Sequence, residues 1–229
     1  MRDHLSPLTS LRFLAALAIV FHHLAGVLWL APGALAPYSL GAAVSFFFVL
    51  SGFIMHHSYA QRLSVGGGRA FLLQRFLRIW PAHIAVIVLC ALWISIPDIL
   101  WQTEHQSISE ILQILFLFQA WNTTPVVFWG LNGPSWSLSV ELFFYGSFPF
   151  LLVAMRYLGQ ARFLLGAAVF TIAWLTFATL VLFDPDAELN ALALGYISPA
   201  ARLGEFALGM AVGALFVAQR STWQAWSRA

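Results

Sequence analysis

The sequence predicts an all-α membrane protein: a polytopic bundle of about six transmembrane helices plus one re-entrant or interfacial segment. The 229-residue chain is 61% hydrophobic, only 9% of its residues are charged, and its mean hydropathy is +0.83. A soluble domain would carry roughly 25% charged residues. In addition, apolar runs of about 20 residues, the length that crosses a bilayer, recur along the whole chain. These observations favour lipid as the solvent of this protein.

Six apolar runs have the length and composition of spanning helices. They are Leu11–Leu30, Leu40–Tyr59, Ile79–Ile96, Trp136–Met155, Phe163–Phe183 and Ala201–Ala218. The first run is too long for a signal-peptide core of about 7–15 residues, so we expect it to be the first span. In the last run, Gly209 and Gly213 have the spacing of a close helix contact, although incidental glycines explain them almost as well.

Arginines decide whether the shorter run Ile108–Trp121 crosses the membrane, because arginine-rich connections stay on the cytoplasmic side. Those in the connections after the second, fourth and sixth spans are Arg62, Arg69, Arg75, Arg78, Arg156, Arg162, Arg220 and Arg228. All of them fall on one side only if the run dips into the membrane and returns to the outer face. We therefore expect an inner (cytoplasmic) membrane of the bacterial type as the location, with both ends of this chain cytoplasmic.

Composition also argues against several classes of function. A formal net charge of +2 is too small to indicate a nucleic-acid partner. The seven histidines are scattered and show no HExxH or mixed Cys/His ligand spacing, so we expect no metal site. The single cysteine, Cys90, lies in an apolar run and rules out an internal disulfide. We interpret it as a small buried hydrophobic residue.

Titratable residues inside apolar runs are the candidates for function, since each is costly at membrane depth unless it is paired. The first run contains His22 and His23, and the fourth contains Glu141. Arg12 and His23 are eleven residues apart, which returns almost to the same helix face, whereas His22 lies off that face. A histidine can act as a general base and a glutamate can orient it. The alternative for each residue is a purely structural hydrogen bond: a histidine could bond to a backbone carbonyl of a neighbouring helix, and Glu141 to the backbone of the turn before its own helix.

Two further pairs have a spacing of three residues, which places both members on one helix face. Arg75 and Arg78 stand at the cytoplasmic end of a span. Such a pair suits a phosphorylated ligand, although spacing alone favours a topology signal or a contact with anionic lipid. Arg202 and Glu205 lie in the last run, and we expect them to form an ion pair with a structural role.

Five stretches together resemble the membrane acyltransferase family 3. They are LTSLRFLAALAIVFHHL, SFFFVLSGFIMHHSY, FLLQRFLRIWPAH, PSWSLSVELFFYGSFP and RLGEFALGMAVG, in the family's order and approximate spacing. The resemblance covers most of the chain and implies a single acyltransferase domain over residues 1–229. It also implies an enzyme that moves an acyl group, often acetyl, from cytoplasmic acyl-CoA to a hydroxyl of a cell-surface or exported carbohydrate. No permanently bound cofactor is implied. Members are usually longer, so the resemblance implies a chain that is incomplete at its C-terminus, either as a fragment or as a shortened homologue.

The same resemblance implies roles for particular residues. His23, eleven residues after Arg12, becomes the catalytic base, and His22 is its alternative. Glu141, which closes the family's Trp-Ser-Leu-x-x-Glu element, becomes the partner of that base. The other residues have binding or supporting roles: Arg12, Arg75 and Arg78 for the CoA donor, and Trp136, Ser137, Tyr145, Arg202 and Glu205 for structure or donor support.

Two other classes of function fit the same residues. A carrier or flippase-like protein would use the buried polar groups to bind a lipid-linked or acylated compound without making a bond. An inactive, truncated relative of the enzymes would only pack against another membrane protein. Transfer of an acyl group distinguishes the enzyme from both.

Overall fold

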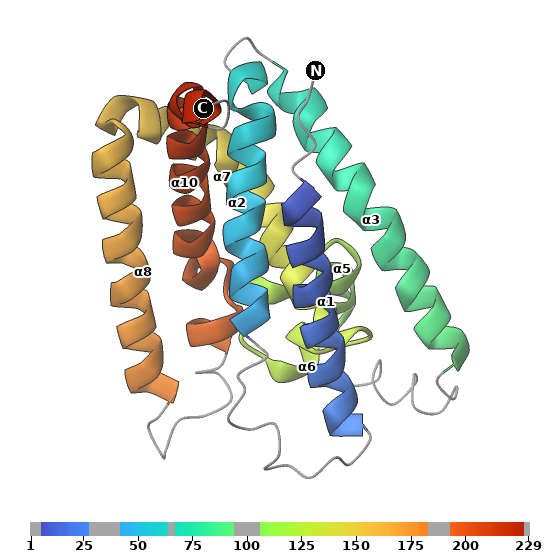
Figure 1. Ribbon diagram of the computed structural model, residues 1–229. Helices are drawn as coiled ribbons and strands as arrows, with labels where there is room; N and C mark the ends of the chain where they lie inside the picture. Colours follow the sequence, from blue (N-terminus) through green and yellow to red (C-terminus); the bar gives the residue numbers. More distant parts are fainter. Residues whose placement is uncertain (1–5, 28–41, 64–66, 94–105, 183–192, 227–229) are drawn as a thin grey trace.

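The computed structural model describes residues 6–27, 42–63, 67–93, 106–182 and 193–226, and the regular elements in these ranges are all helical. The predicted all-α fold class is therefore confirmed. The long helices are α1 (Ser6–Val27), α2 (Ala42–Leu63), α3 (Gly68–Trp93), α7 (Trp136–Leu158), α8 (Gln160–Leu182) and α10 (Pro199–Trp226) (Figure 1). The short elements are α5 (Ile108–Leu115), η1 (Gln119–Trp121), α6 (Pro125–Phe128), η2 (Gly133–Ser135) and the π-helical turn η3 (Ala193–Ile197).

Five helices, α2, α3, α7, α8 and α10, are long and apolar enough to cross a membrane. In α1 the described apolar segment, Ser10–Phe21, is shorter, and the end of the first predicted span, residues 28–30, lies outside the described residues. The segment predicted to be re-entrant forms only the short elements α5 and η1. Because α3 ends and α7 begins towards the same end of the bundle, this segment does not cross (Figure 1).

The third spanning helix starts earlier than its apolar run predicts. α3 begins at Gly68, whereas the predicted span begins at Ile79. Arg75 therefore belongs to the third turn of the helix rather than to a polar connection. Its side chain is only 7% exposed and lies against aromatic rings, so protein replaces water around it. A hydropathy scale counts every arginine as strongly polar, even one that is covered by protein, and therefore places the start of this helix too late in the sequence.

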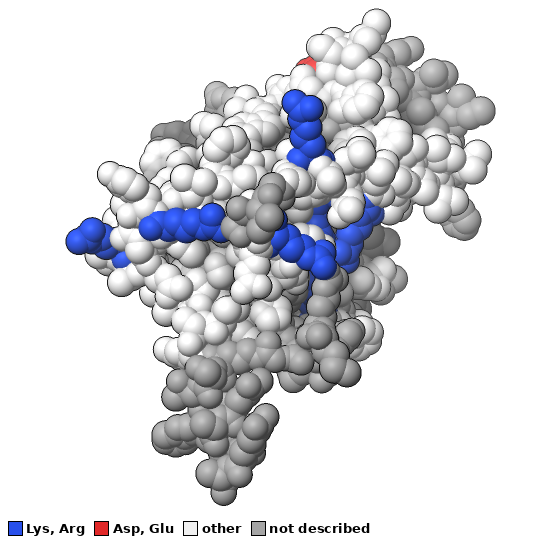
Figure 2. Space-filling model, turned by 90° about the horizontal axis from the view of Figure 1, so that it is seen from above, with Lys and Arg blue, Asp and Glu red and all other residues white. Residues whose placement is uncertain are grey.

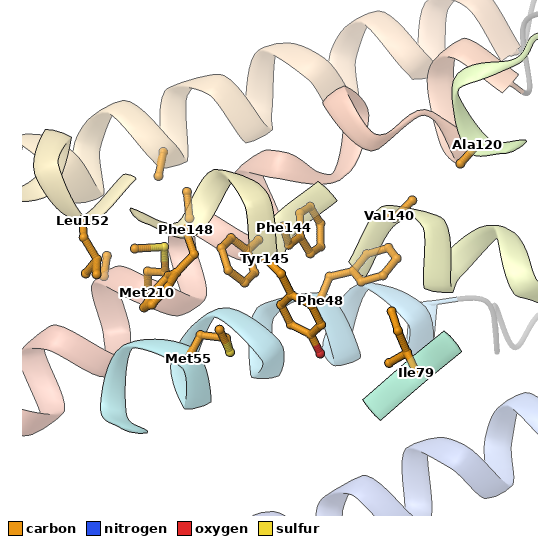
Figure 3. Packing of buried hydrophobic residues seen from close by; sticks show 14 of the residues in the cluster. Phe48, Met55, Ile79, Ala120, Val140, Phe144, Tyr145, Phe148, Leu152 and Met210 are labelled. Atoms are coloured by element: carbon orange, nitrogen blue, oxygen red, sulfur yellow. The ribbon is translucent and has the colours of Figure 1, made fainter. Parts of the chain in front are cut away.

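The core lies where α2, α7 and α10 meet (Figure 3). Phe144 of α7 stacks on Phe206 of α10 with ring centroids 4.6 Å apart, and Phe48 of α2 meets Phe144 edge-on at 5.2 Å. Met55 and Met210 fill the space beside these rings. Aromatic pairs of this kind add about 0.5–1.5 kcal/mol each beyond the burial of their area. This packing fixes α7, the helix that contributes Glu141, against α2.

Glycines bring α2 and α10 into backbone contact. Gly209 of α10 faces the carbonyl oxygen of Val49 so closely that a Cβ atom would overlap it. At Gly213, one turn further, a Cβ would lie 2.9 Å from the carbonyl oxygen of Phe53. Gly52 contributes to the same contact from α2. The close helix approach predicted from the spacing of Gly209 and Gly213 is therefore confirmed.

The arginine-rich helix ends share one face of the bundle. Arg62 is at the end of α2, Arg69 at the start of α3, Arg156 at the end of α7 and Arg162 at the start of α8. Figure 2, which views this end from above, shows arginine side chains spread over it. α10 ends on the same side (Figure 1). The structure thus agrees with the grouping of the arginine-rich connections, while their cytoplasmic location stays a prediction.

Candidate active site

A cavity of about 300 Å³ between α1, α2, α3 and α7 brings together four of the predicted site residues, Ser137 among them. Arg12, Arg78 and Glu141 line it, together with the hydroxyl side chains of Ser51 and Ser137. The rest of the lining is apolar: Ile19, Val44, Phe47, Phe48 and Leu50. The volume is at the lower end of the range of small-molecule sites. Residues far apart in the sequence thus place two cations and one carboxylate around a single space.

The charges in this cavity do not neutralise one another by direct contact. Arg12 is repelled by Arg78 and attracted by Glu141. Among the described residues, no arginine nitrogen lies within 4 Å of the Glu141 carboxylate, and the ion pair that forms is Arg202–Glu205, elsewhere in the fold. Charged groups at membrane depth are costly without a partner. Two cations and one carboxylate therefore leave an excess of positive charge that favours an anionic ligand.

Glu141 is held in place by Tyr145, one turn later on α7. The Tyr145 hydroxyl donates a hydrogen bond to Glu141 Oε1. Tyr145 is buried, whereas Glu141 is only partly buried and reaches the cavity. The turn before α7, which is the alternative partner of Glu141, forms hydrogen bonds within itself instead: Ser135 Oγ donates to the Asn132 carbonyl at 2.6 Å. Glu141 thus faces the cavity with one carboxylate oxygen fixed.

Arg75 lies behind this tyrosine and does not line the cavity. Its guanidinium is 4.3 Å from the ring centroid of Tyr59 and 5.5 Å from that of Tyr145, with Phe71 at 5.9 Å. Cation–π contacts of a desolvated arginine are worth about 2 kcal/mol. Arg78 is exposed and reaches the cavity instead. The expected convergence of Arg75 and Arg78 on one ligand is therefore not what the structure shows.

The two histidines of α1 are placed only by their backbone, because the side chains of His22 and His23 lie outside the described residues. Arg12 and Ile19, two helical turns apart, both line the cavity from α1. Position 23 follows Ile19 by four residues, which is one further turn of the same helix. The helix that presents Arg12 to the cavity therefore continues past it to the two histidines.

The remaining predicted residues lie at the starts of α7 and α10. Arg202 Nη1 and Glu205 Oε1 are 2.8 Å apart and both residues are buried, which confirms the predicted ion pair. Arg202 Nε also donates to the Tyr196 carbonyl at 2.7 Å, and the Tyr196 ring packs on Trp136 with centroids 5.4 Å apart. Ser137 Oγ donates to the backbone three residues earlier at 2.9 Å while lining the cavity. Arg202, Glu205 and Trp136 thus join η3, α7 and α10.

Two residues that the sequence analysis did not single out anchor the re-entrant segment. Trp80 Nε1 donates to the Leu115 carbonyl at 3.0 Å, and His83 Nε2 lies 2.9 Å from the Ile114 carbonyl. These carbonyls are in the last turn of α5, where carbonyls lack their regular helical partner, although Ile114 also accepts from the Leu117 N–H at 3.3 Å. The three-residue spacing of Trp80 and His83 on α3 is the signal in the sequence that could have indicated a shared partner.

Comparison with known proteins supplies the family. The family model described as an acyltransferase domain matches residues 8–229. Acyltransferase MdmB of Streptomyces mycarofaciens is 31% identical over 225 residues, which cover 90% of this chain and 56% of that protein. Nodulation protein 10 of Rhizobium leguminosarum bv. viciae is 30% identical over 149 residues, 57% of this chain and 38% of that protein.

The chain spans about half the length of the first of these relatives and less of the second. No solved structure matches it significantly. The family match covers nearly all of the chain and includes the stretches that contain Arg12, Glu141 and Arg202. The chain therefore belongs to acyltransferase family 3, the family that its five sequence stretches resemble.

Proposed function

We propose that this chain forms the membrane part of an O-acyltransferase that uses cytoplasmic acyl-CoA, with acetyl as its acyl group. The acceptor in this proposal is a hydroxyl of a cell-surface or exported carbohydrate. Family membership supports the reaction class, and the motif resemblance supports the donor and acceptor. The observation that carries the proposal is the cavity in which Arg12, Arg78 and Glu141 converge from three different helices.

The arginines of the cavity suit the anionic part of the donor. CoA carries phosphates, and guanidinium groups bind phosphate through paired, charge-assisted hydrogen bonds. Arg12 and Arg78 line the cavity from the halves of α1 and α3 that are nearer the arginine-rich face. Because Arg75 is enclosed by Tyr59 and Tyr145, its role in this proposal is to support the wall behind Glu141 rather than to touch the donor.

The chemistry of the proposal is a direct acyl transfer with His23 as general base. His23 takes the proton of the acceptor hydroxyl as that oxygen attacks the thioester carbonyl. The new C–O bond forms, the C–S bond breaks, and the proton returns to the departing thiolate of CoA. Glu141 orients the imidazole and stabilises its charged form, as carboxylates do in other pairs of a base and its orienting acid. Arg12 and His23 are separated by about 16 Å along α1, which allows donor and acceptor to enter from opposite sides.

The test measures CoA thiol released from acetyl-CoA by membranes containing this protein, with and without a surface-glycan acceptor. A general base contributes about 10²–10⁴-fold to rate. We therefore expect His23→Ala to lose at least about 100-fold of the acceptor-dependent release, and the neighbouring His22→Ala to stay within a few-fold of wild type. Mass spectrometry of the acceptor should show one added acyl group for each thiol released.

Two outcomes would contradict the proposal. If His23→Ala releases thiol at the wild-type rate while His22→Ala does not, the base is misassigned by one residue. If wild-type membranes bind donor and acceptor but yield no ester on the glycan, the carrier interpretation is favoured over the enzyme. Arg78→Gln, which alters only the donor side, should raise the KM for acetyl-CoA and leave the base in place.

A further inference from the structure

A second polar cavity lies at the arginine-rich end of the bundle. It measures about 400 Å³ and is formed by α2, the end of α7 and the start of α8. Its polar lining consists of His56, Gln61, Arg156 and Gln160. The remainder is Ala60, Leu152, Met155 and Gly159. No residue lines both this cavity and the one that contains Glu141, so the second cavity is separate from the candidate active site.

The charge around this cavity is positive and has no acidic counterpart in the described part of the chain. The acidic residues within the described ranges are Glu110, Glu141 and Glu205, and none of them lines the cavity or pairs with Arg156. Figure 2 shows several separate arginine side chains on this end of the molecule and a single small acidic area at the edge of the described surface in this view. The described helices therefore supply no carboxylate that would compete with an external anion for Arg156.

The side chains of the cavity have donors available for an anion. Arg156 Nη2 makes one long hydrogen bond, 3.4 Å, to the Ala60 carbonyl, which leaves most of the five N–H donors of its guanidinium for other partners. His56 lies close enough to Arg156 for its protonated form to be repelled by the guanidinium. Its Nδ1 atom is buried without a hydrogen-bond partner among the described residues. A guanidinium fork with an imidazole beside it matches the oxygens of a phosphate group.

We propose that this cavity binds the phosphate group of an anionic phospholipid. The cavity lies at the ends of α2 and α7 and the start of α8, three helices long and apolar enough to span a membrane. Basic pockets between helix ends of this kind bind lipid head groups. Half of its lining is apolar, in keeping with the glycerol and upper acyl region of a lipid rather than with a freely soluble anion. The predicted cytoplasmic location of this end also matches the leaflet in which anionic head groups attract basic residues.

The test is native mass spectrometry of the protein in a neutral detergent, titrated with phosphatidylglycerol, with phosphatidylcholine, or with inorganic phosphate. We expect wild type to retain one phosphatidylglycerol in preference to phosphatidylcholine. Arg156→Gln should weaken this binding about tenfold or more, as expected for loss of a charge-assisted fork. The affinity of Arg156→Lys for phosphatidylglycerol should lie between those of wild type and Arg156→Gln, because lysine keeps the charge but lacks the forked guanidinium. His56→Leu should also weaken binding.

The matched control is Arg162→Gln, which removes the same charge from the same end of the bundle but from a residue outside the cavity. It should change phosphatidylglycerol binding by no more than about twofold. Equal losses in Arg156→Gln and Arg162→Gln would overturn the proposal in favour of diffuse attraction. Equal retention of both lipids would overturn it as well, and displacement of phosphatidylglycerol by millimolar inorganic phosphate would point to a soluble ligand instead.

Discussion

Replacing Gly209 by alanine tests the backbone contact between α2 and α10. The added Cβ would overlap the Val49 carbonyl oxygen, which belongs to backbone and has no rotamer through which to move away. α2 and α10 must then separate along their common length. Gly213→Ala is milder, since its Cβ would lie 2.9 Å from the Phe53 oxygen and ordinary contact begins at 3.4 Å, a deficit of 0.5 Å.

These overlaps give a graded series of stabilities. Overpacking in a well-packed interior costs about 1–3 kcal/mol. We expect Gly213→Ala at the lower end, about 1 kcal/mol, and Gly209→Ala at about 3 kcal/mol or more. The control is Gly166→Ala in α8, where a Cβ would meet no atom within 4 Å. There the higher helix propensity of alanine should leave stability unchanged or raise it by up to about 1 kcal/mol.

The assay is equilibrium unfolding in mixed micelles of a mild detergent and sodium dodecyl sulfate, followed by tryptophan fluorescence. The midpoint should fall in the order Gly166→Ala, Gly213→Ala, Gly209→Ala. A Gly209→Ala protein as stable as Gly166→Ala would refute the close approach of the two helices. Reversal of the order of Gly209→Ala and Gly213→Ala would instead show that the contact is tightest one turn later than the structure places it.

Two further predictions concern the hydrogen bonds of the carboxylates Glu141 and Glu110. Tyr145→Phe removes the hydroxyl that fixes Glu141 and should lower kcat by about 10- to 100-fold, the equivalent of one hydrogen bond to a charged group, with little change in KM for acetyl-CoA. The control is Tyr59→Phe, which alters the other tyrosine ring packed on Arg75 and should leave kcat unchanged. If both variants lost kcat equally, Tyr145 would not act through Glu141. At the start of α5, the backbone N–H and hydroxyl of Ser107 donate to Glu110 and hold the pKa of this exposed carboxyl below its usual value. The cap is thus complete when the pH is above the usual carboxyl pKa, and it is lost as the pH falls through the lowered pKa. Near neutral pH, the amides of α5 should therefore exchange more slowly in wild type than in Glu110→Gln. This difference should vanish in acid.

Most of the helix arrangement could be predicted from hydropathy and arginine placement. The start of α7 at Trp136 agrees with the apolar run, and the non-crossing nature of the segment around Ile108 followed from the positions of the arginines. The start of α3 could not be predicted, because Arg75 is covered by Tyr59 and Tyr145, which come from other helices. Only the folded chain shows that such rings are available to enclose it.

The individual residues of the candidate site could be predicted from the sequence, but which of them line one cavity could not. The one-turn spacing of Glu141 and Tyr145 is visible in the sequence, and the structure joins them by a hydrogen bond. That Arg78 rather than Arg75 accompanies Arg12 depends on how α3 is rotated against α7. Helix spacing does not fix this rotation, since residues three apart share a face only approximately. Packing against neighbouring helices decides which of the two reaches the cavity.

The glycine contact and the candidate site are mechanically linked through α2. One side of this helix, at Val49, is pressed against α10, while Ser51 and Phe47 form a wall of the cavity. The buried Arg202 strengthens the same link, since its Nη1 lies 3.4 Å from the Ser45 hydroxyl of α2. A substitution that pushes α2 away from α10 must therefore move this wall against α1 or α7, because close-packed interiors transmit displacement rather than absorb it. Gly209→Ala should accordingly impair acyl transfer even at temperatures at which the protein remains folded.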